Sequence, residues 1–459
     1  RRIGLTMKYL VKDLEQILNA KKINIVENKE ITGIAIDSRK VKEGDLFIPF
    51  LGENVDGHNY IESAFEKGAA ASLSLKEDFT SDNNIIYVED SYVAIQALAK
   101  HYLDSLNAKI IAITGSNGKT TTKDIITGLL ETKFKVHKTQ GNFNNELGVP
   151  ITILAAPEDS EILVLEMGAD GFGQLDFLSK LVEPDYTVIT NIGESHIEFF
   201  GSREGIAKAK FEITNGMKKD GFFVYNGDEV FLKDLVDKSN IGATSCGEND
   251  YNNIILENYS ITRDHIDFKL NLSDGKFTTK LKGKHNLFNI MFATAIAEKL
   301  GLSIDEIRKA IEKTSEITHM RLESIPYGKD SLIINDAYNA SPTSMKASVD
   351  VVSGFDDFDY KTLVLGSMFE LGSNEVQYHS EVGEYISNNS KDIDLVISVG
   401  DLAKNITDSI TNTEIKTLHF SSNEEVSNYL KENKHANEVI LFKASRSMKL
   451  ESIIEEINK

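Results

Sequence analysis

The sequence predicts an α/β protein with three domains, and three observations lead to this prediction. The chain has 459 residues, which is about three times the usual length of a domain. Short β-branched runs alternate with helical stretches, a pattern typical of mostly parallel sheets covered on both faces. At Ile110–Asp124 a strand, a glycine turn, a Lys-Thr pair and a helix follow one another, as in a phosphate-binding loop.

The composition is that of an ordinary globular protein, with 41% hydrophobic and 26% charged residues. The net charge of −21 argues against binding to nucleic acid or anionic membranes, since both need basic surfaces. Cys246 is the only cysteine, which excludes internal disulfides and suits a reducing compartment. No apolar run is as long as a membrane span. We expect a cytoplasmic protein without membrane insertion or signal peptide, and we interpret Met7, after Arg1–Thr6, as the natural start.

Residues 7–104 are predicted to form a small α/β domain. The predicted helices cover residues 10–18, 60–67 and 90–103, and the predicted strands are Gly33–Ile36 and Leu46–Pro49. These strands flank Asp37-Ser38-Arg39, and His58 follows. An arginine with neighbouring donors on a strand-end loop can hold a diphosphate or a carboxylate. The alternative is a surface turn with an ion pair, which is the commoner case for such a motif alone.

Residues 105–313 are predicted to form a central domain that contains the phosphate loop. Its expected parallel strands are Ile110–Ile113, Glu161–Leu165, Tyr186–Thr190 and Gly221–Tyr225. Between Ile241 and Lys282 the pattern changes, and we expect a small antiparallel excursion with strands at 259–262, 265–270 and 277–281. A long apolar helix is predicted at Phe288–Leu300, preceded by Lys284-His285-Asn286.

Residues 314–459 are predicted to form a doubly wound, Rossmann-like domain, because strand candidates alternate with helices throughout. The expected strands are Leu332–Ile334, Thr362–Leu365, Leu395–Val399, Thr417–Phe420 and Glu438–Phe442.

The phosphate loop supplies the strongest functional signal. The turn consists of Gly115, Ser116, Asn117 and Gly118, and Lys119, Thr120 and Thr121 begin the helix. Unpaired backbone N–H groups and the helix dipole attract phosphate there. Lys119 would contact the β- and γ-phosphates of a nucleotide, and the Thr120 hydroxyl would bind Mg²⁺. The loop is a short variant, because Ile113 stands where the usual spacing has glycine. A solvated lysine after a glycine turn is the alternative, but the flanking strand and helix favour nucleotide binding.

Two further strand ends carry groups suited to a metal. Glu166 ends one strand, and at the carboxyl edge of a parallel sheet its carboxylate can hold Mg²⁺. A helix cap or an exposed charge is the alternative. His196 follows the end of another strand and is a candidate ligand, although a lone histidine is more often structural. Lys208 and Lys210 are two residues apart, so on a helix they point in different directions. One of them can approach the phosphates while the other is solvated.

The stretch from Gly141 to Pro150 places Asn142, Asn144 and Asn145 between two glycines. Such a loop is rich in hydrogen-bond donors and suits substrate amides or phosphate. The alternative is an Asx-rich turn without a ligand.

The sequence resembles the Mur ligase family of ATP-dependent amide-forming enzymes in peptidoglycan precursor synthesis. The phosphate loop and the stretch Lys284-His285-Asn286…Asn289 are shared across that family. Three stretches resemble the members that join D-alanyl-D-alanine to UDP-N-acetylmuramoyl-tripeptide: residues 141–150, 336–342 and 369–372. The resemblance runs from Asp37 to Arg446. Ser341, Ser367 and Ala444 depart from it, standing where Asn, Asp and Gly are frequent.

The resemblance implies roles for individual residues. Lys119 would contact the ATP phosphates, Thr120 would bind a first Mg²⁺, and Glu166 and His196 a second. Lys210 matches a lysine that relatives carry as an N-carbamate, which helps to position that metal. The residues matching those around adenine and ribose are Asn286, Asn289, Arg321 and Asp336. Those expected at the UDP-sugar substrate are Asp37, Ser38, Arg39 and His58, with Asn142 and Asn145 also expected to bind substrate.

The implied reaction has two steps, in which the peptide carboxylate takes the γ-phosphate of ATP and the amine of D-alanyl-D-alanine then displaces phosphate. We expect a monomer that is open without ligand and closed with nucleotide and substrate. The third residue of the tripeptide, lysine or diaminopimelate, stays open. The alternatives are another amide ligase of the superfamily, such as a folylpolyglutamate synthetase or the ligase that adds the preceding residue, and a non-catalytic sensor of UDP-sugars. A sensor would not need Glu166, His196 and Lys210 together.

Overall fold

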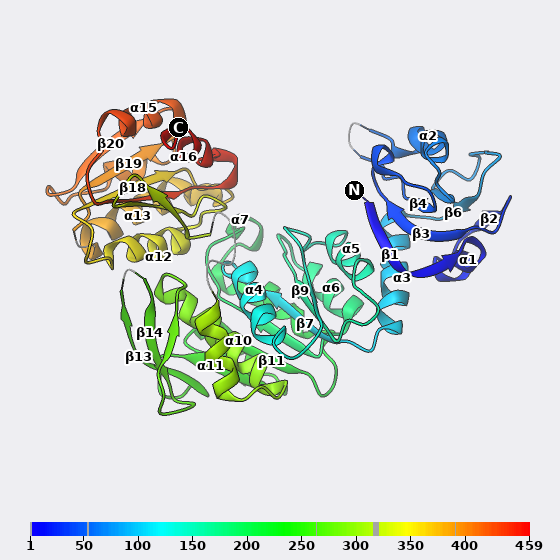
Figure 1. Cartoon of the computed structure of the whole chain (residues 1–459), viewed down its shortest axis with the longest axis horizontal. Coiled ribbons are helices and arrows are strands. Elements are labelled where there is room, and N and C mark those ends of the chain that lie inside the picture. Colours follow the sequence, from blue (N-terminus) through cyan, green and yellow to red (C-terminus); the bar gives the residue numbers. More distant parts are fainter. Residues whose placement is uncertain (1, 53–54, 263, 315–320, 391) are drawn as a thin grey trace.

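A computed structural model describes residues 2–52, 55–262, 264–314, 321–390 and 392–459. It contains three sheets that follow one another along the chain, as Figure 1 shows from blue through green to red. The central domain lies between the other two (Figure 1). The predicted α/β class with mostly parallel sheets is confirmed. The predicted boundary between the second and third domains is next to residues 315–320, which lie outside the described residues.

The first sheet has six strands in the order β1-β3-β4-β5-β6-β2. Its strands are β1 Arg2–Leu10, β2 Lys22–Asn24, β3 Glu30–Ala35, β4 Asp45–Phe47, β5 Ala71–Ser74 and β6 Ile85–Tyr87. β3 to β6 run parallel, while β1 and β2 pair antiparallel at the two edges. The helices of this region are α1 Leu14–Ile17, α2 Ile61–Glu66 and α3 Ser91–Ser105.

The structure modifies one expectation for this first region. The predicted helix at 10–18 is only a 3₁₀ turn, Val11–Asp13, followed by the single turn of α1. Leu10 instead pairs with Glu30 at the end of β1, so sheet pairing overrides the helical pattern. The first strand includes residues before Met7, and Met7 as the natural start stays a prediction. Arg2 pairs with Ala35, and its Nε lies 2.8 Å from the buried carboxylate of Asp45.

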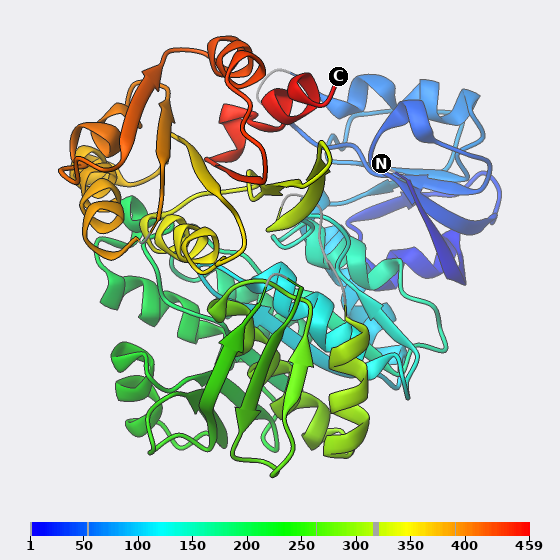
Figure 2. The same cartoon turned by 60° about the vertical axis from the view of Figure 1, so that its left-hand side comes forward.

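The central sheet has nine strands in the order β15-β14-β13-β12-β11-β10-β7-β9-β8. The strands are β7 Lys109–Thr114, β8 Val136–Lys138, β9 Ile162–Glu166, β10 Tyr186–Ile189, β11 Phe222–Asn226, β12 Ala243–Gly247, β13 Ile254–Ile261, β14 Ile266–Leu270 and β15 Phe277–Thr279. β7 to β13 run parallel, and β14 and β15 are antiparallel. The antiparallel excursion is therefore confirmed, and it continues the main sheet (Figure 2).

Helices cover both faces of the central sheet and create two apolar cores. The helices are α4 Lys119–Leu130, α5 Gly148–Leu154, α6 Gln174–Val182, α7 Ile197–Phe200, α8 Arg203–Phe211, α9 Val230–Asp237, α10 Lys284–Lys299 and α11 Ile304–Lys313. α4 and α10 share one core, which fixes the start of the phosphate-loop helix beside the start of α10. The predicted helix at 288–300 thus begins four residues earlier, at Lys284.

The third sheet has the order β16-β17-β21-β18-β19-β20. The strands are β16 Glu323–Tyr327, β17 Ser331–Asn335, β18 Tyr360–Gly366, β19 Leu395–Val399, β20 Lys416–Phe420 and β21 Glu438–Lys443. All pairs are parallel except that of β16 with β17. The helices are α12 Pro342–Ser353, α13 Glu375–Asn389, α14 Lys404–Asp408, α15 Asn423–Glu432 and α16 Glu451–Ile457. The five predicted strands are confirmed, and β16 was not predicted.

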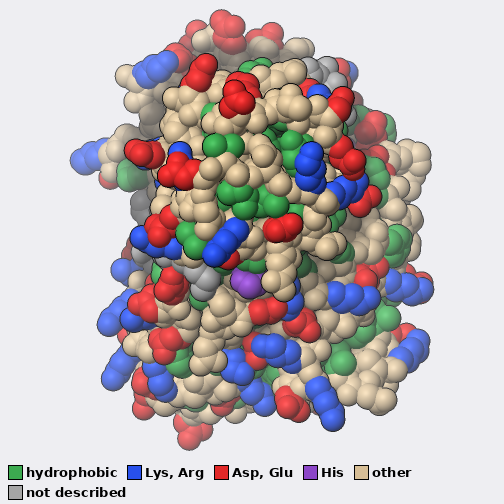
Figure 3. All heavy atoms as spheres, turned by 90° about the vertical axis from the view of Figure 1, so that its right-hand side faces the viewer, with side chains coloured by type: hydrophobic (Ala, Val, Ile, Leu, Met, Phe, Trp, Pro, Cys, Tyr) green, Lys and Arg blue, Asp and Glu red, His purple; other side chains and the backbone are tan. Residues whose placement is uncertain are grey.

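Charged side chains of both signs are interspersed on the face that Figure 3 turns to the viewer. Within the described ranges, every helix is too short or too polar to cross a bilayer.

Asp185 fixes the end of the central sheet opposite the phosphate loop. Its carboxylate accepts the N–H of Ile110 on β7 and the ammonium groups of Lys109 and Lys218, all at 2.9–3.0 Å. Burial alone would raise the pKa of Asp185, but the hydrogen bonds from Lys218, Ile110 and Lys109 lower it below the usual value. This contact holds β7 in register with β10.

Replacing Asp185 with asparagine should lower the local free energy of unfolding by roughly 1–3 kcal/mol, because buried donors lose a charged acceptor. A folded-state pKa below the unfolded value means that this contribution is complete above about pH 4 and is lost as the pH falls further. Hydrogen exchange of the β7 amides measures it. Asp159→Asn, which breaks the exposed pair with Lys135, should change stability by less than about 0.5 kcal/mol. Equal effects of the two substitutions would contradict this assignment.

Candidate functional site

The candidate site lies where three neighbouring parallel strands of the central sheet end. β7 runs between β9 and β10, so their carboxyl ends meet at one edge. The phosphate loop follows β7, Glu166 is the last residue of β9, and the His196 loop follows β10. This edge is where ligands bind in open α/β sheets.

The phosphate loop is tied to the strand end beside it. Gly115 and Gly118 have φ angles of +150° and +79°, which other residues rarely adopt. The Asn117 N–H donates to Asn191 Oδ1 at 2.8 Å, and Lys119 Nζ folds back to the Gly115 carbonyl at 2.8 Å. Burial lowers the pKa of Lys119, and the carboxylate of Glu166 opposes this shift. The loop therefore presents a partly desolvated cation beside free helix N–H groups.

Glu166 is held by donors from two other segments. The Thr120 hydroxyl donates to Glu166 Oε2 at 2.8 Å, and Asn144 Nδ2 donates to Oε1 at 3.0 Å. The Glu166 N–H donates to the hydroxyl of Thr139 at 2.9 Å. Only 2% of Glu166 is exposed. The structure thus brings Thr120 and Glu166 together on the same side of the sheet.

Lys210 and His196 complete a crowded, positively charged corner. Lys210 lies on α8 and is 1% exposed, and burial together with the charge of Lys119 lowers its pKa to about 7. Burial also lowers the pKa of His196, where Glu370 opposes the shift and Lys210 adds to it. Lys208 points outward and pairs with Glu204 at 2.8 Å. The two lysines diverge as the helical spacing predicts, and Lys210 is the one inside.

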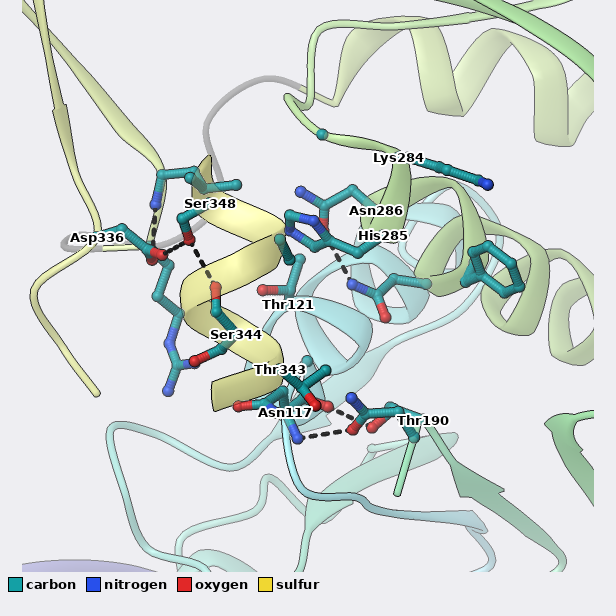
Figure 4. Close-up of a pocket in the computed structure, with 18 of the residues that line it drawn as sticks. Asn117, Thr121, Thr190, Lys284, His285, Asn286, Asp336, Thr343, Ser344 and Ser348 are labelled. Atoms are coloured by element: carbon teal, nitrogen blue, oxygen red, sulfur yellow. Dashed lines mark hydrogen bonds between the residues drawn. The ribbon is translucent and has the colours of Figure 1, made fainter. Parts of the chain in front are cut away.

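Residues from α10 and from the third domain line the same cavity, whose volume is about 1050 Å³. Figure 4 shows Asn286 and His285 on α10 across from Ser344 and Ser348 on α12. Asn289 Nδ2 donates to Asn286 Oδ1 at 2.9 Å. The cavity is therefore built from both the central and the third domain.

The third-domain side of the cavity carries a carboxylate and a guanidinium. Asp336 accepts hydrogen bonds from Lys443 Nζ and the Ser348 hydroxyl, each at 2.6 Å (Figure 4). The guanidinium of Arg321 lies 4.3 Å from the ring centre of Tyr338, and its buried Nε has no hydrogen-bond partner among the described residues. This unsatisfied donor suits an acceptor on a ligand in the cavity.

The residues expected at the UDP-sugar lie elsewhere. Asp37, Ser38, Arg39 and His58 are in the first domain and do not line the cavity. Arg39 is mostly exposed and pairs with Asp37 at 2.9 Å. His58 is buried, and its Nε2 accepts the Leu75 N–H at 2.9 Å while Nδ1 lies 2.7 Å from Asp56. The side chain of His58 therefore supports a loop in this structure.

The asparagines of the amide-rich loop make different kinds of contact. Asn142 lines the cavity, and its contact with substrate stays a prediction. Asn145 Oδ1 instead accepts the Gly148 N–H at 2.8 Å, at the start of α5. Asn144, for which no role was expected, holds Glu166. Asp170 was also missed, although its charge acts on Lys210 and on His196. Its place four residues after Glu166, at the same strand end, was the available signal.

No group of three or more His, Cys, Asp and Glu side chains in the described parts of the chain is arranged to hold a metal. The oxygens of Thr120 and Glu166, 2.8 Å apart, nevertheless match the hard ligands that Mg²⁺ takes beside nucleotide phosphates. The residues present therefore fit Mg²⁺ held jointly with a ligand.

Comparisons with known proteins agree with this geometry. The Mur ligase family catalytic domain matches residues 30–110, the Mur ligase middle domain residues 113–297, and the glutamate ligase domain of Mur ligases residues 320–446. The UDP-N-acetylmuramoyl-tripeptide–D-alanyl-D-alanine ligase of Bacillus subtilis is 42% identical over an alignment of 461 positions that covers 98% of each chain. That of Haemophilus influenzae is 34% identical over 96% of each chain. The chain belongs to the Mur ligase family.

Two solved structures extend the likeness to the whole fold. A crystal structure of MurF from Acinetobacter baumannii superposes with a TM-score of 0.90 at 27% identity, over 99% of both chains. MurF from Thermotoga maritima in complex with ADP superposes with a TM-score of 0.84 at 31% identity, over 93% of this chain and 96% of that chain.

Lys210→Met should stabilise the ligand-free protein by roughly 1–4 kcal/mol at pH 6 in CO₂-free buffer, because it removes a buried charge. The pKa of about 7 in the folded protein lies below the ordinary lysine value. The free-energy cost of burying the charged Lys210 is therefore present in full below pH 7. It fades as the pH rises toward about 10, and the advantage of the variant fades with it. Calorimetric unfolding measures the difference. Lys208→Met, at the exposed neighbour, should change little, and a stabilisation independent of pH would contradict the assignment.

Proposed function

We propose that this chain is the ATP-dependent ligase that joins D-alanyl-D-alanine to UDP-N-acetylmuramoyl-tripeptide, a step in peptidoglycan precursor synthesis. The observation that carries the proposal is the convergence of the phosphate loop, Glu166 and the His196 loop at one sheet edge. The relatives that share nearly the full length bear this activity in their names.

The reaction proceeds in two steps. The terminal carboxylate of the tripeptide attacks the γ-phosphorus of ATP, giving an acyl phosphate and ADP. The amine of D-alanyl-D-alanine then attacks the acyl carbon, a proton leaves the nitrogen, and phosphate departs as the amide forms. The first step brings two anions together, and Lys119 with the loop N–H groups lowers this repulsion.

The nucleotide occupies the cavity between the central and third domains. Lys119 and the loop of Gly115 to Thr121 hold the phosphates. Asn286, Asn289, Arg321 and Asp336 hold adenine and ribose, a proposal supported by their position in the lining of the cavity, the first two on α10 and the other two on the third-domain side.

Thr120, Glu166 and His196 are proposed to hold two Mg²⁺ ions with the phosphates. Bound there, Mg²⁺ would screen the phosphate charge from the incoming carboxylate. Glu166 keeps its carboxylate aimed at the site through the bonds from Thr120 and Asn144. Lys210 is proposed to carry an N-carbamate, which turns a buried cation into an oxygen ligand. Only a neutral amine adds CO₂, and the pKa of about 7 leaves much of Lys210 neutral.

The UDP-sugar is proposed to bind at Asp37, Ser38, Arg39 and His58, and the peptide to run past Asn142 and Asn145. Domain boundaries of 7–104, 105–313 and 314–459 accompany this assignment. The first domain would carry the substrate toward the cavity, with closure over the nucleotide excluding water from the acyl phosphate. We propose a monomer, and a cytoplasmic location because ATP and the UDP-linked substrate are nucleotides.

The decisive experiment measures ADP formation with UDP-N-acetylmuramoyl-tripeptide, with and without D-alanyl-D-alanine. The proposal expects sustained turnover only with the dipeptide and none with glutamate or with a single diamino acid. Turnover with one of those amines would favour another ligase of the family. Binding of the UDP-substrate without turnover with any amine would favour a sensor.

The carbamate is tested by ¹³C NMR after equilibration with ¹³C-bicarbonate. The wild type should show a carbamate carbon and lose activity on CO₂ depletion. Lys210→Arg keeps the positive charge but cannot be carbamylated, and should lack both the signal and most activity. Lys208→Arg should keep both, since Lys208 is exposed. A signal that persists in Lys210→Arg would place the modification elsewhere.

A further inference from the structure

A carboxylate of the third domain reaches the histidine of the central site. Glu370 lies on the loop after β18, and its Oε2 is 2.6 Å from Nδ1 of His196. No role was assigned to Glu370, although its sequence neighbourhood resembled the family. The contact joins residues 174 positions apart, so it exists only while the third domain is docked against the central one.

Both partners have strained backbones. His196 has a φ angle of +61° and Glu370 one of +62°, a left-handed conformation that few residues other than glycine adopt. Such strain persists only where the surroundings fix it, and it gathers at functional sites. Two hydrogen bonds fix the Glu370 loop: the Met368 N–H donates to Nε2 of buried His379 at 2.9 Å, and the Phe369 N–H donates to the Ser445 hydroxyl at 3.1 Å.

A second contact holds the same segment from the other side. The carboxylate of Glu194, two residues before His196, accepts the N–H of Thr343 at 3.1 Å and its hydroxyl at 2.6 Å. Thr343 lies in the first turn of α12, where unpaired N–H groups favour an anion. Two carboxylates therefore join the His196 loop to the third domain: Glu194 extends from the loop to α12, and Glu370 extends from the third domain to His196.

We propose that Glu370 is a positioning residue. Its carboxylate accepts a hydrogen bond from the Nδ1–H of His196, which orients the ring and leaves Nε2 free to face a metal ion. This inference rests on the proposed function, in which His196 is a metal ligand. Histidine ligands generally donate their second ring N–H to a carboxylate or carbonyl, which fixes the tautomer and the ring plane. Here that partner arrives from another domain. Docking of the third domain would thus complete the metal site at the moment when the cavity closes.

The alignment of the pair supports a conformational role. Although Nδ1 and Oε2 are 2.6 Å apart, Nδ1 of His196 has no aligned hydrogen-bond partner among the described residues. Hydrogen bonds of catalytic groups are often misaligned without ligand and tighten in the complex. The alternative is an ordinary exposed ion pair, because about half of the Glu370 side chain is solvent-accessible.

The tautomer of His196 distinguishes a positioning role of Glu370 from an ordinary exposed ion pair, and it is measured without an activity assay. The experiment uses ¹⁵N-histidine-labelled full-length protein with a non-hydrolysable ATP analogue and UDP-tripeptide, and His196→Gln identifies the signal. The wild type should show the proton on Nδ1. Glu370→Ala should lose this preference, while Glu370→Gln, whose amide oxygen still accepts, should keep it. Glu384→Ala, at an exposed glutamate on α13, serves as the control.

Metal affinity gives the second readout, from a titration of the same complex with Mn²⁺. Glu370→Ala should weaken binding by roughly 10–100-fold, Glu370→Gln less, and Glu384→Ala not at all. Turnover should fall through kcat, with KM for ATP little changed. Small-angle scattering checks that the domains dock alike in all variants. If the third domain of Glu370→Ala is undocked, the tautomer and the Mn²⁺ affinity are compared between Glu370→Gln and the wild type instead.

A wild-type proton on Nε2, or Mn²⁺ affinity unchanged in Glu370→Ala, would overturn the inference. Neither outcome touches the ligase assignment, which depends on wild-type turnover with D-alanyl-D-alanine.

Discussion

The hydrogen bond between the Thr120 hydroxyl and the Glu166 carboxylate is the contact on which the site depends. It joins the first turn of the phosphate-loop helix to the end of the neighbouring strand, at 2.8 Å and out of solvent. Asn144 completes the arrangement from the amide-rich loop. A buried carboxylate needs such donors, because desolvation without them would make its charge costly. Three separate segments are therefore forced to meet at one point of the sheet edge.

The same corner brings two buried lysines, Lys119 and Lys210, close to the carboxylates of Glu166 and Asp170. Burial lowers the pKa of both Lys119 and Lys210, and the charge of Lys119 lowers that of Lys210 as well. Such a cluster is unfavourable without ligand, and a triphosphate together with a carboxylate substrate would relieve it. Acidic overall composition does not conflict with polyanion binding, because the few cations that matter converge here.

The sequence predicted those features of the site that depend on a single helix, strand or turn. The phosphate loop, the strand end at Glu166 and the divergence of Lys208 from Lys210 all follow from spacing along one element. The choice among Asn142, Asn144 and Asn145 did not, because the direction of each amide is set by the packing of a loop. Glu370 was out of reach for a similar reason, since its contact with His196 depends on how two domains dock. The helix expected at residues 10–18 is helical only over residues 11–17, as a 3₁₀ turn and one α-turn, and Leu10 pairs with Glu30 in the sheet instead.

The central claim is that a carboxylate of the substrate attacks the γ-phosphorus at this sheet edge, and oxygen isotopes test it most directly. UDP-tripeptide carrying ¹⁸O in both oxygens of its terminal carboxylate is turned over with ATP and D-alanyl-D-alanine, and the released phosphate is analysed by mass spectrometry. An acyl phosphate requires the bridging oxygen to leave with phosphorus, so each phosphate should contain one ¹⁸O atom. Phosphate free of ¹⁸O, formed alongside amide, would show that the carboxylate never bonds to phosphorus and would contradict the mechanism.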